Sequence, residues 1–501
     1  MAEIDVILPT NSRYWQIVLA ERLAAAGHDV RLLQSAADDA WPTLLEATLS
    51  VERRVASRFR PLWERANAAA LPASHARAGR ALRIDLTGRT PEKAETTVLS
   101  PAFEGSPSAA AAAITVAANR LPIVRVLRDG DVPVAEAKPM LDARLLVGRG
   151  FDDVLARTVS LLAAAVERHL RGALSALRED VCPGPARKPL PGLAKGLAFS
   201  TVPALARECI RRAGHWPSHW RVGYRFHEGM GLAETGSLAG PDWSILPDDG
   251  RRYYADPFPF EWQGSHYLFV EEYPHETGKG VISVARFDAN RHPTTPQVVL
   301  EKPFHLSYPQ VFELDGGIWM LPESGAGREL SLYKAECFPD QWVRHAVLIE
   351  GRELYDATLL RHGGRHWLFA AERDGAGSTS DMLVVFHSER LEGPWLPHKA
   401  NPVLIDYAAA RPAGAFVHVG RRLVRPVQDG TLGYGGGLCL SDVIRLDEER
   451  VELSQPVPLL LTRNWPYPRI HTLNRAGSLE VIDGIANVRK RDAGPASREA
   501  A

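Results

Sequence analysis

Charged and polar residues recur at fixed points of a hairpin pattern that repeats along the second half of the chain. The first hairpin runs from Tyr253 to Glu272 (YYADPFPFEWQGSHYLFVEE): one strand opens at Asp256-Pro257, a Gln-Gly-Ser turn follows, and the second strand ends at Glu271-Glu272. Similar units open at Tyr308, Asp356, Arg411 and His471, so successive units start 52, 48, 55 and 60 residues apart. A period of about 50 residues with several short strands predicts propeller blades. We count five.

Hairpin geometry predicts where these polar residues meet. The second strand of a hairpin runs back antiparallel, so its end returns to the face where the first strand began. The residues expected at that face are Asp256 with Glu271 or Glu272, Tyr308 with Glu323, Asp356 with Glu372, Arg411 with Gln428 and Asp429, and His471 with Asp483. The step within a hairpin is 15 residues from Tyr308 to Glu323 and 16 from Asp356 to Glu372. We expect the whole set to converge on one mouth of the propeller.

Several carboxyl groups at one mouth suit chemistry at a glycosidic bond. Two carboxyl groups across such a bond can supply an acid and a base or nucleophile, and crowding in a partly dry site raises at least one pKa. The candidate catalytic residues are Asp256, Glu323 as the acid, and Asp356 as a pKa-setting or sugar-binding carboxylate. The candidate substrate-binding residues are Glu272, Tyr308, Glu372, Arg411, Asp429 and His471. No metal site or cofactor is predicted.

Simpler explanations exist for some of these residues. Asp-Pro is also a common turn, so Asp256 could be structural, and Glu323 could cap backbone groups in PESGAG. Arg411 could hold a carboxylate or phosphate of a ligand. Trp319 and Trp367 could stack on sugars, although packing between blades is the more common use of such residues.

The first third of the chain has the alternating pattern of a parallel α/β domain, here a Rossmann-like one. Ile4–Leu8 is a buried type of strand, Tyr14–Ala26 a helix and Asp29–Leu33 a second strand. Further strands are expected at 81–86, 96–99 and 123–127, and a long amphipathic helix at 152–177.

No glycine-rich phosphate motif follows the first strand, where PTNSRYW stands instead. The layout, with LPTNS after that strand and DLTG at Asp85–Gly88, resembles the formyltransferase fold. Such enzymes use an Asn-x-His pair that this chain lacks. We therefore expect a formyltransferase-like domain without that activity, one that docks, regulates or binds.

Composition excludes some classes of function. The 59 basic and 60 acidic residues nearly cancel, which gives no global reason to expect nucleic acid. Four cysteines without a CxxC pair suggest neither a disulfide framework nor a zinc site. The N-terminus has no signal-peptide pattern and the longest small-apolar run, 109–118, is about half a membrane span. We expect a cytoplasmic protein without a transmembrane segment, of unknown oligomeric state.

The domain boundary is predicted at 181–196, VCPGPARKPLPGLAKG, which is rich in Pro, Gly and basic residues. The expected organisation is an α/β domain at 1–180, a linker and helix at 181–215, a propeller at 216–488 and a disordered tail at 489–501. The strand Trp220–Phe226 is expected to join the first and last blades, as a closed propeller requires.

A family resemblance lies in ADPF at Ala255–Phe258, HLSYPQVFE at His305–Glu313, MLPES at Met320–Ser324, YDATLL and HTLN. Residues 215–488 resemble the propeller domain found N-terminally in plant glucosamine inositolphosphorylceramide transferases, which has many bacterial relatives. The resemblance implies a five-bladed propeller similar to furanosidase-type glycoside hydrolases, with Asp256 at the position of their base or nucleophile. Ser307-Tyr308-Pro309 departs from those hydrolases, which often carry a second Asp there.

Three hypotheses follow. The first is a carbohydrate-active protein that cleaves or transfers a glycosidic bond in surface-glycan or glycolipid metabolism, with a saccharide, glycolipid or nucleotide sugar as partner. The second is a non-catalytic module that binds a glycan or nucleotide sugar. The third is an amino-sugar formyl or acyl transferase that uses the N-terminal domain.

Overall fold

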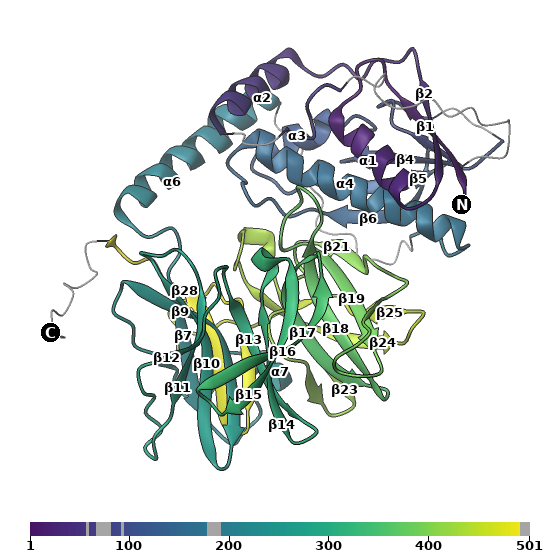
Figure 1. Ribbon diagram of the computed structural model, residues 1–501. Helices are drawn as coiled ribbons and strands as arrows, with labels where there is room; N and C mark the ends of the chain where they lie inside the picture. The colour runs from purple at the N-terminus through teal and green to yellow at the C-terminus, as the bar shows by residue number, and fades with distance from the viewer. Residues whose placement is uncertain (57–59, 67–81, 92–94, 178–191, 491–501) are drawn as a thin grey trace. The chain divides into compact units, whose positions relative to one another are not determined.

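The computed structural model describes residues 1–56, 60–66, 82–91, 95–177 and 192–490 (Figure 1). The chain forms two compact units: Met1–Glu208 with Asp374–Ser378, and Cys209–Arg373 with Thr379–Ala501. The division after Glu208 falls in the segment predicted as linker and helix. Most of the predicted linker at 181–196 lies outside the described residues, as does the predicted tail from residue 491 onward.

Unit 1 is built on a mixed sheet with the strand order β6-β5-β4-β3-β1-β2. Its strands are β1 (Glu3–Leu8), β2 (Asp29–Gln34), β3 (Leu82–Asp85), β4 (Val98–Phe103), β5 (Val124–Arg128) and β6 (Val132–Lys138). The strands β1 to β4 pair in parallel, whereas β5 and β6 pair antiparallel. Ile4, Val6 and Leu8 of β1 are buried, which explains why this short apolar run can be recognised from the sequence.

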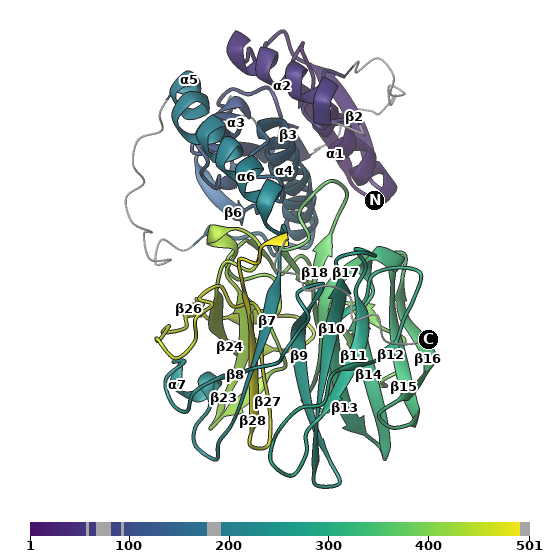
Figure 2. The ribbon, with the colours of Figure 1, turned by 90° about the vertical axis from the view of Figure 1, so that its left-hand side faces the viewer.

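Four helices accompany this sheet: α1 (Tyr14–Ala25), α2 (Thr43–Ala56), α3 (Ala110–Ala117) and α4 (Val147–Leu170). The amphipathic helix predicted at 152–177 is α4, which begins earlier and ends earlier than predicted. Gly172 explains the early end, because its φ of 68° is left-handed and terminates the helix. A further helical run joins α5 (Leu193–Gly196), a π-helical turn η2 (Leu197–Thr201) and α6 (Val202–Gly214) (Figure 2).

Unit 2 consists of antiparallel sheets in a propeller-like arrangement (Figure 2). In chain order, the sheets after β8 are β9-β10-β11-β12, β13-β14-β15-β16, β17-β18-β19 with β20 and β21 paired to β19, and β22-β23-β24 with β25 and β26 paired to β24. The remaining sheet has the order β27-β28-β7-β8. Apolar cores fill the spaces between neighbouring sheets; one of them joins Phe258 of β9 with Met320 of β14 and Tyr333 of β15.

The strands of unit 2 have the following bounds: β7 (Trp220–Phe226), β8 (Ser244–Ile245), β9 (Arg252–Trp262), β10 (Ser265–Pro274), β11 (Val281–Arg286), β12 (Gln297–Leu300), β13 (Ser307–Leu314), β14 (Gly317–Glu323), β15 (Glu329–Cys337), β16 (Gln341–Glu350), β17 (Glu353–His362), β18 (Arg365–Arg373), β19 (Met382–Ser388), β20 (Leu396–Pro397), β21 (Leu404–Asp406), β22 (Val417–Val419), β23 (Arg422–Gln428), β24 (Leu438–Leu446), β25 (Val451–Leu453), β26 (Val457–Pro458), β27 (Leu473–Ala476) and β28 (Leu479–Ile485). A short helix α7 (Leu232–Thr235) lies between β7 and β8. No described helix is both long enough and apolar enough to cross a membrane.

The strand Trp220–Phe226 joins the beginning of unit 2 to its end, as predicted. It is β7, and it pairs antiparallel with β28 from Phe226 opposite Leu479 to Trp220 opposite Ile485. Because β28 is the last strand described, this pairing brings the two ends of the unit into one sheet. A closed propeller needs such a pairing.

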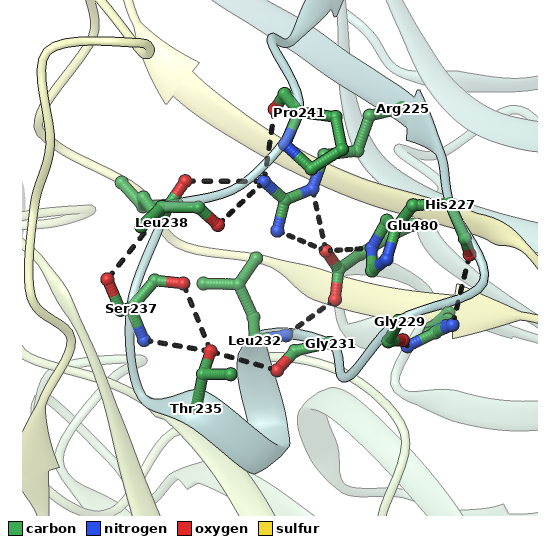
Figure 3. Close-up of polar contacts among 12 residues, drawn as sticks. Arg225, His227, Gly229, Gly231, Leu232, Thr235, Ser237, Leu238, Pro241 and Glu480 are labelled. Carbon is green, nitrogen blue, oxygen red and sulfur yellow. Dashed lines mark hydrogen bonds and ion pairs between the residues drawn. The ribbon is translucent and has the colours of Figure 1, made fainter.

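A buried ionic group, which we call the closure cluster, ties this sheet to the loop after β7 (Figure 3). It consists of Arg225, His227 and Glu480. Glu480 Oε2 lies 2.9 and 2.7 Å from Arg225 Nε and Nη2 and 3.1 Å from His227 Nε2. Its other oxygen accepts a hydrogen bond of 2.6 Å from the Leu232 amide. Arg225 also donates to the carbonyls of Leu238, Ala239 and Pro241, so the buried charges are well satisfied.

Candidate functional site

The same backbone irregularity opens three successive sheets of unit 2. In β9, β13 and β17, two residues oppose a single residue of the partner strand, which is the pattern of a β-bulge. The first residue of each bulge is left-handed: Asp256 has a φ of 47°, Tyr308 of 47° and Asp356 of 50°. This conformation is costly for residues other than glycine, and such strain concentrates at functional sites.

These bulges contribute to a group of buried polar side chains that we call the central cluster. Its members are Asp256, Glu271, Glu323, Asp356, Arg411, Gln428, His471 and Asp483, all of them buried. They come from β9, β10, β14, β17, the segment before β22, β23, the segment before β27 and β28. Five sheets therefore supply one cluster, as the hairpin geometry predicts.

Arg411 organises one half of the central cluster. Its Nε and Nη2 lie 2.5 and 3.2 Å from the carboxylate oxygens of Asp356. Its Nη2 also lies 3.4 Å from Glu323 Oε2. Glu323 accepts a hydrogen bond from the Asp356 amide at 3.1 Å, and Gln428 donates to Asp356 Oδ2 at 2.8 Å. One guanidinium group thus holds two carboxyl groups in a fixed geometry.

His471 organises the other half. Its Nδ1 lies 2.7 Å from Asp483 Oδ2 and its Nε2 lies 3.4 Å from Asp256 Oδ1. Burial disfavours a charged ring, but the nearby carboxylates of Asp483 and Asp256 outweigh it and raise the pKa of His471. The Thr472 hydroxyl donates to Asp256 Oδ1 at 2.8 Å, and Asp483 accepts from the Asp256 amide at 3.1 Å.

Asp256, His471 and Asp483 also have ligand atoms within 4.8 Å of one another, a spacing compatible with a metal ion. The imidazole ring already lies between the two carboxylates as their cation. The arrangement is therefore explained without a metal, and the expectation of none stays a prediction.

The cluster holds more carboxyl groups than cations. Burial raises the pKa of Asp256 to about 6, with the Asp356 and Asp483 carboxylates adding to the effect and His471 opposing it. Burial likewise raises the pKa of Glu271 and of Glu323 well above the usual value, and neighbouring carboxylates raise both further. Only Glu323 has Arg411 to oppose this rise. Glu271 therefore has the environment of a proton donor at neutral pH.

Glu271, rather than its neighbour Glu272, belongs to the central cluster. In β10, Glu271 pairs with Ala255 and Glu272 with Tyr254, so their side chains lie on opposite faces. Glu272 instead lies 2.5 Å from Arg252 Nη1 and accepts from Ser283 at 2.8 Å. The sequence carried the signal, since Glu271 follows Asp256 by the same 15 residues that separate Tyr308 from Glu323.

Two more predicted binding residues lie outside the central cluster. Glu372 forms a bidentate pair with Arg352 at 2.7 and 2.6 Å, and Ala371 occupies the register position equivalent to Glu271. Asp429 accepts from the Thr431 amide at 2.9 Å and caps the turn Gly430–Leu432. Both carboxylates are thus engaged in local contacts.

The predicted aromatic residues are mostly structural. The Tyr308 hydroxyl accepts from the Gly414 amide at 2.6 Å and contacts the Thr358 hydroxyl at 2.9 Å. Its buried ring packs on Phe258, edge to face, at 4.8 Å. Trp319 and Trp367 are buried in apolar cores, in line with the packing alternative.

Other aromatic rings lie at the accessible edge of the cluster. Tyr434 is 45% exposed, and its ring centroid lies 5.1 Å from the Arg411 guanidinium carbon and 5.6 Å from the His471 ring. Tyr355 is half-buried and lies 5.5 Å from Arg411. On the other half, half-buried Tyr273 lies 6.0 Å from the ring of His305, whose Nε2 is 3.4 Å from Glu271 Oε1. We call Tyr273, Tyr355 and Tyr434 the aromatic rim.

Tyr434 was not among the predicted site residues, because it lies in GYGGG, a pattern typical of a tight turn. The turn is real: Gly435 has a φ of 60°, and a Cβ there would lie 2.2 Å from the Trp220 ring. Glycine lets the turn pack against Trp220, whose ring stacks on His471 at 3.8 Å. The turn therefore places Tyr434 beside the cluster.

Comparison with known families confirms the relation expected for the propeller. Residues 248–474 match the family model described as "Glucosamine inositolphosphorylceramide transferase 1, N-terminal". This range contains every member of the central cluster except Asp483, and it contains the whole aromatic rim. It is a little under half of the chain.

Curated relatives agree with this match. Glucosamine inositolphosphorylceramide transferase 1 of rice (Oryza sativa) is 34% identical over 252 residues, which cover 46% of this chain and 33% of that protein. The protein of the same name from Arabidopsis thaliana is 32% identical over 232 residues, 44% of this chain and 30% of that one. The chain spans about a third of the length of these relatives.

Solved structures share a distant similarity. A family 117 glycoside hydrolase of Zobellia galactanivorans has a TM-score of 0.35 at 13% identity, covering 52% of this chain and 80% of that one. An exo-β-1,3-galactanase of Clostridium thermocellum has a TM-score of 0.34 at 12% identity, covering 46% and 59%. Similarity at this level carries no argument about activity.

Proposed function

We propose that unit 2 binds a saccharide over the central cluster and cleaves or transfers a glycosidic bond. The observation that carries the proposal is the charge of the cluster: five buried carboxyl groups (Asp256, Glu271, Glu323, Asp356 and Asp483) face two cations (Arg411 and His471). Burying unbalanced charge is costly. Such a group is expected where protonated and ionised carboxyl groups are needed side by side.

A saccharide suits the surroundings of these groups. Carboxylates accept hydrogen bonds from sugar hydroxyls, and tyrosine rings offer both an apolar face and a hydroxyl. The half-exposed rings of the aromatic rim lie next to buried carboxylates and Arg411. A purely apolar ligand would leave the polar groups of the cluster unpaired.

The proposed roles follow from the partners of each carboxyl group. Asp256 is the base or nucleophile, oriented by Thr472 and His471. Glu271 is the proton donor, because burial, and after it four neighbouring carboxylates, raise its pKa well above the usual value. Glu323 is the second candidate for the acid, and Asp356 with Arg411 positions it. A glycosidic bond held between Asp256 and Glu271 would have the acid and the base that its cleavage requires.

The binding-module hypothesis has one observation in its favour. Arg411 contacts both Asp356 and Glu323, which is the pairing expected where acids are structural. Glu271 distinguishes the two hypotheses, since a binding module has no need of a protonated acid there.

The transferase hypothesis for unit 1 has less support. His28 lies 2.8 Å from Glu167, but it directly precedes β2. It therefore lies at the amino end of the parallel strands, whereas ligands of open α/β sheets bind at the carboxyl ends. A Rossmann-like, formyltransferase-like ancestry of unit 1 stays a proposal, as does a count of five blades for unit 2. The latter is supported by the five sheets that reach the central cluster.

The test compares two adjacent residues. Sugars, sugar phosphates and nucleotide sugars are screened by thermal shift on the wild type, Glu271→Gln and the matched control Glu272→Gln. A ligand that binds the native state raises the melting temperature by mass action. Turnover of each hit is then measured by product analysis.

We expect a hit that the wild type and Glu272→Gln convert, and that Glu271→Gln binds but converts at least about 100-fold more slowly. Binding without turnover by the wild type would replace the catalytic proposal with the binding module. Turnover that Glu271→Gln retains would remove Glu271 from the role of acid. The absence of a hit in every ligand class would contradict a saccharide site.

A further inference from the structure

Gly280 brings two segments of unit 2 together beside the proposed acid. It is buried and directly precedes β11. Its amide donates to His305 Nδ1 at 2.9 Å, and its carbonyl accepts from the Leu306 amide at 3.1 Å. A Cβ at this position would lie 2.4 Å from the Leu306 carbonyl oxygen, 2.7 Å from His305 Cε1 and 2.9 Å from Glu271 Oε1. Glycine is therefore what lets the imidazole ring and the carboxyl group lie side by side.

The hydrogen bond from Gly280 fixes which ring nitrogen of His305 carries the proton. A backbone amide can only donate, so Nδ1 must accept and must be unprotonated. Burial, and after it the positive charge of Arg411, lowers the pKa of His305 to about 4, so the ring is neutral at neutral pH. In a neutral ring whose Nδ1 accepts, the proton is on Nε2. The Nε2 atom of His305 is therefore a donor and not a base.

This donor lies next to the carboxyl group of Glu271. The distance from His305 Nε2 to Glu271 Oε1 is 3.4 Å, which is longer than an ordinary hydrogen bond. Such contacts in active sites commonly shorten when the substrate binds. The other groups that raise the pKa of Glu271 are carboxylates: Asp256, Glu323, Asp483 and Asp356. Ionised carboxylates accept hydrogen bonds but cannot donate them, so His305 differs in kind from these neighbours.

We propose that His305 is the positioning residue of the acid: its Nε2–H group donates to Glu271 Oε1 and thereby leaves the carboxyl proton on Glu271 Oε2. From Oε2 the proton passes to the leaving-group oxygen as the glycosidic bond breaks and that oxygen takes the bonding electron pair. Holding one oxygen keeps the carboxyl group in the orientation that this transfer needs. The inference rests on the proposed function, in which Glu271 protonates the leaving group.

His398 has the same ring arrangement without a carboxyl group. Its Nδ1 accepts from the Ala400 amide at 2.9 Å, and its Nε2 lies 2.7 Å from the Asp447 carbonyl oxygen. A backbone amide thus fixes the tautomer of both histidines, but the second nitrogen of His398 binds backbone. His398→Asn is therefore a matched control for changes at His305.

Two variants separate the two nitrogens of His305. Asparagine places an amide oxygen near the position of Nδ1, so His305→Asn keeps the acceptor for Gly280 and loses the donor to Glu271. Glutamine places an amide nitrogen near the position of Nε2, so His305→Gln keeps the donor and loses the acceptor. The measurement is infrared spectroscopy of the full chain across about pH 4 to 9. Each protein is compared with the same protein carrying Glu271→Gln, so that the difference reports the protonated carboxyl group of Glu271.

In His305→Asn, we expect the carbonyl stretch of Glu271 to move to higher wavenumber, because the carbonyl oxygen loses its donor. The proton affinity of Glu271 should rise about fivefold, because a donor to a carboxylate favours the ionised form. His305→Gln and His398→Asn should match the wild type in both respects. An unchanged spectrum and titration in His305→Asn, or equal changes in His305→Asn and His305→Gln, would overturn the proposal.

Turnover separates failure of this inference from failure of the proposed function. With the sugar, sugar phosphate or nucleotide sugar that the wild type converts, kcat should fall about tenfold in His305→Asn at unchanged KM and stay near the wild-type value in His305→Gln. A loss in His305→Gln that His305→Asn does not share would show that the ring only holds Gly280, and would overturn the proposal. If the wild type converts no ligand, the proposed function fails, whereas the infrared titration still decides whether His305 directs the proton of Glu271. Circular dichroism and melting temperature check that each variant is folded.

Discussion

The closure cluster and the central cluster are both buried ionic groups within unit 2, but they differ in balance. In the closure cluster, the Glu480 carboxylate is hydrogen-bonded to Arg225, His227 and a backbone amide. Arg225 also donates hydrogen bonds to three backbone carbonyls. In the central cluster, five carboxyl groups share two cations, and the pKa of three of them is raised. Satisfied charge in the first case holds the fold together, whereas unsatisfied charge in the second is kept at a cost in stability.

This difference gives a physical criterion for separating structural from functional charge. Burial alone does not separate them, because Glu480 and Glu271 are both buried. What differs is the balance of partners: Glu480 lies against Arg225, His227 and a backbone amide, whereas the five carboxyl groups of the central cluster share two cations. Natural proteins tolerate destabilising groups mainly where activity needs them.

The largest expected effect is loss of the closure cluster's cation. Arg225→Met leaves Glu480 buried with His227 and the Leu232 amide as its remaining partners, and it removes the bonds to the loop after β7. We expect destabilisation by about 3–5 kcal/mol, measured by urea unfolding at pH 8. If the variant folds, its affinity for ligands of the central cluster should equal that of the wild type. A loss below about 1 kcal/mol would show that the cluster does not hold the sheet together.

Removal of Arg411 should cost somewhat less and should depend on pH. Arg411→Met leaves Asp356 and Glu323 without their shared cation, and we expect a loss of about 3 kcal/mol at pH 8. The loss should shrink toward pH 5, because protonating Glu323, whose pKa is already raised, removes an unpaired charge. Unfolding curves at the two pH values test this. A loss that is independent of pH would contradict the account of the cluster's charge.

Removal of a surplus carboxyl group should raise the stability of the protein instead of lowering it. Because the pKa of Glu271 is raised in the folded state, its ionisation costs stability as pH rises from the unfolded value through the folded one. Glu271→Gln should therefore stabilise the protein by about 0.5–2 kcal/mol at pH 8 and by much less near pH 4. Melting temperatures of this variant and of Glu272→Gln across that range provide the comparison. Destabilisation of Glu271→Gln at pH 8 would show that the cluster is balanced after all.

The smallest effect is expected at the surface. Arg422 forms a bidentate pair with Asp442 at 2.9 and 2.7 Å, but the Arg422 side chain is 60% exposed. Arg422→Met should leave the free energy of unfolding close to that of the wild type, because solvent screens an exposed ion pair. This variant is the baseline for the effects of Arg225→Met and Arg411→Met. A loss of stability as large as theirs would contradict the view that buried and exposed ion pairs differ in their contribution.

Much of this architecture was predictable from the sequence. Period-two alternation and turn residues predict the hairpins and their repeat. They also predict that one polar residue lies near the start of each successive sheet: Asp256, Tyr308, Asp356, Arg411 and His471. The closing strand Trp220–Phe226 was recognised with its observed bounds. The relation to the propeller family was predicted from a few short sequence motifs.

The remainder depends on backbone geometry that leaves no local signal. The bulges place the non-glycine residues Asp256, Tyr308 and Asp356 in a left-handed conformation, which their residue types alone do not predict. The choice between Glu271 and Glu272 did leave a signal, the step of 15 residues from Asp256, but the step of 16 from Asp356 to Glu372 points the other way. The engagement of Glu372 by Arg352 and of Asp429 by its own turn likewise depends on contacts that spacing alone does not specify.

The pairing of β7 with β28 also determines how the protein can be cut. The family match covers 248–474, so a fragment made to those limits would lack β7, β8 and β28. It would lose Asp483 and the closure cluster together, and it would present open strand edges that favour aggregation. A fragment intended to fold alone should instead begin before Trp220 and extend past Ile485. By the same reasoning, joining these two neighbouring ends by a short linker and opening the chain at a different hairpin turn should yield a permuted protein with its central cluster intact.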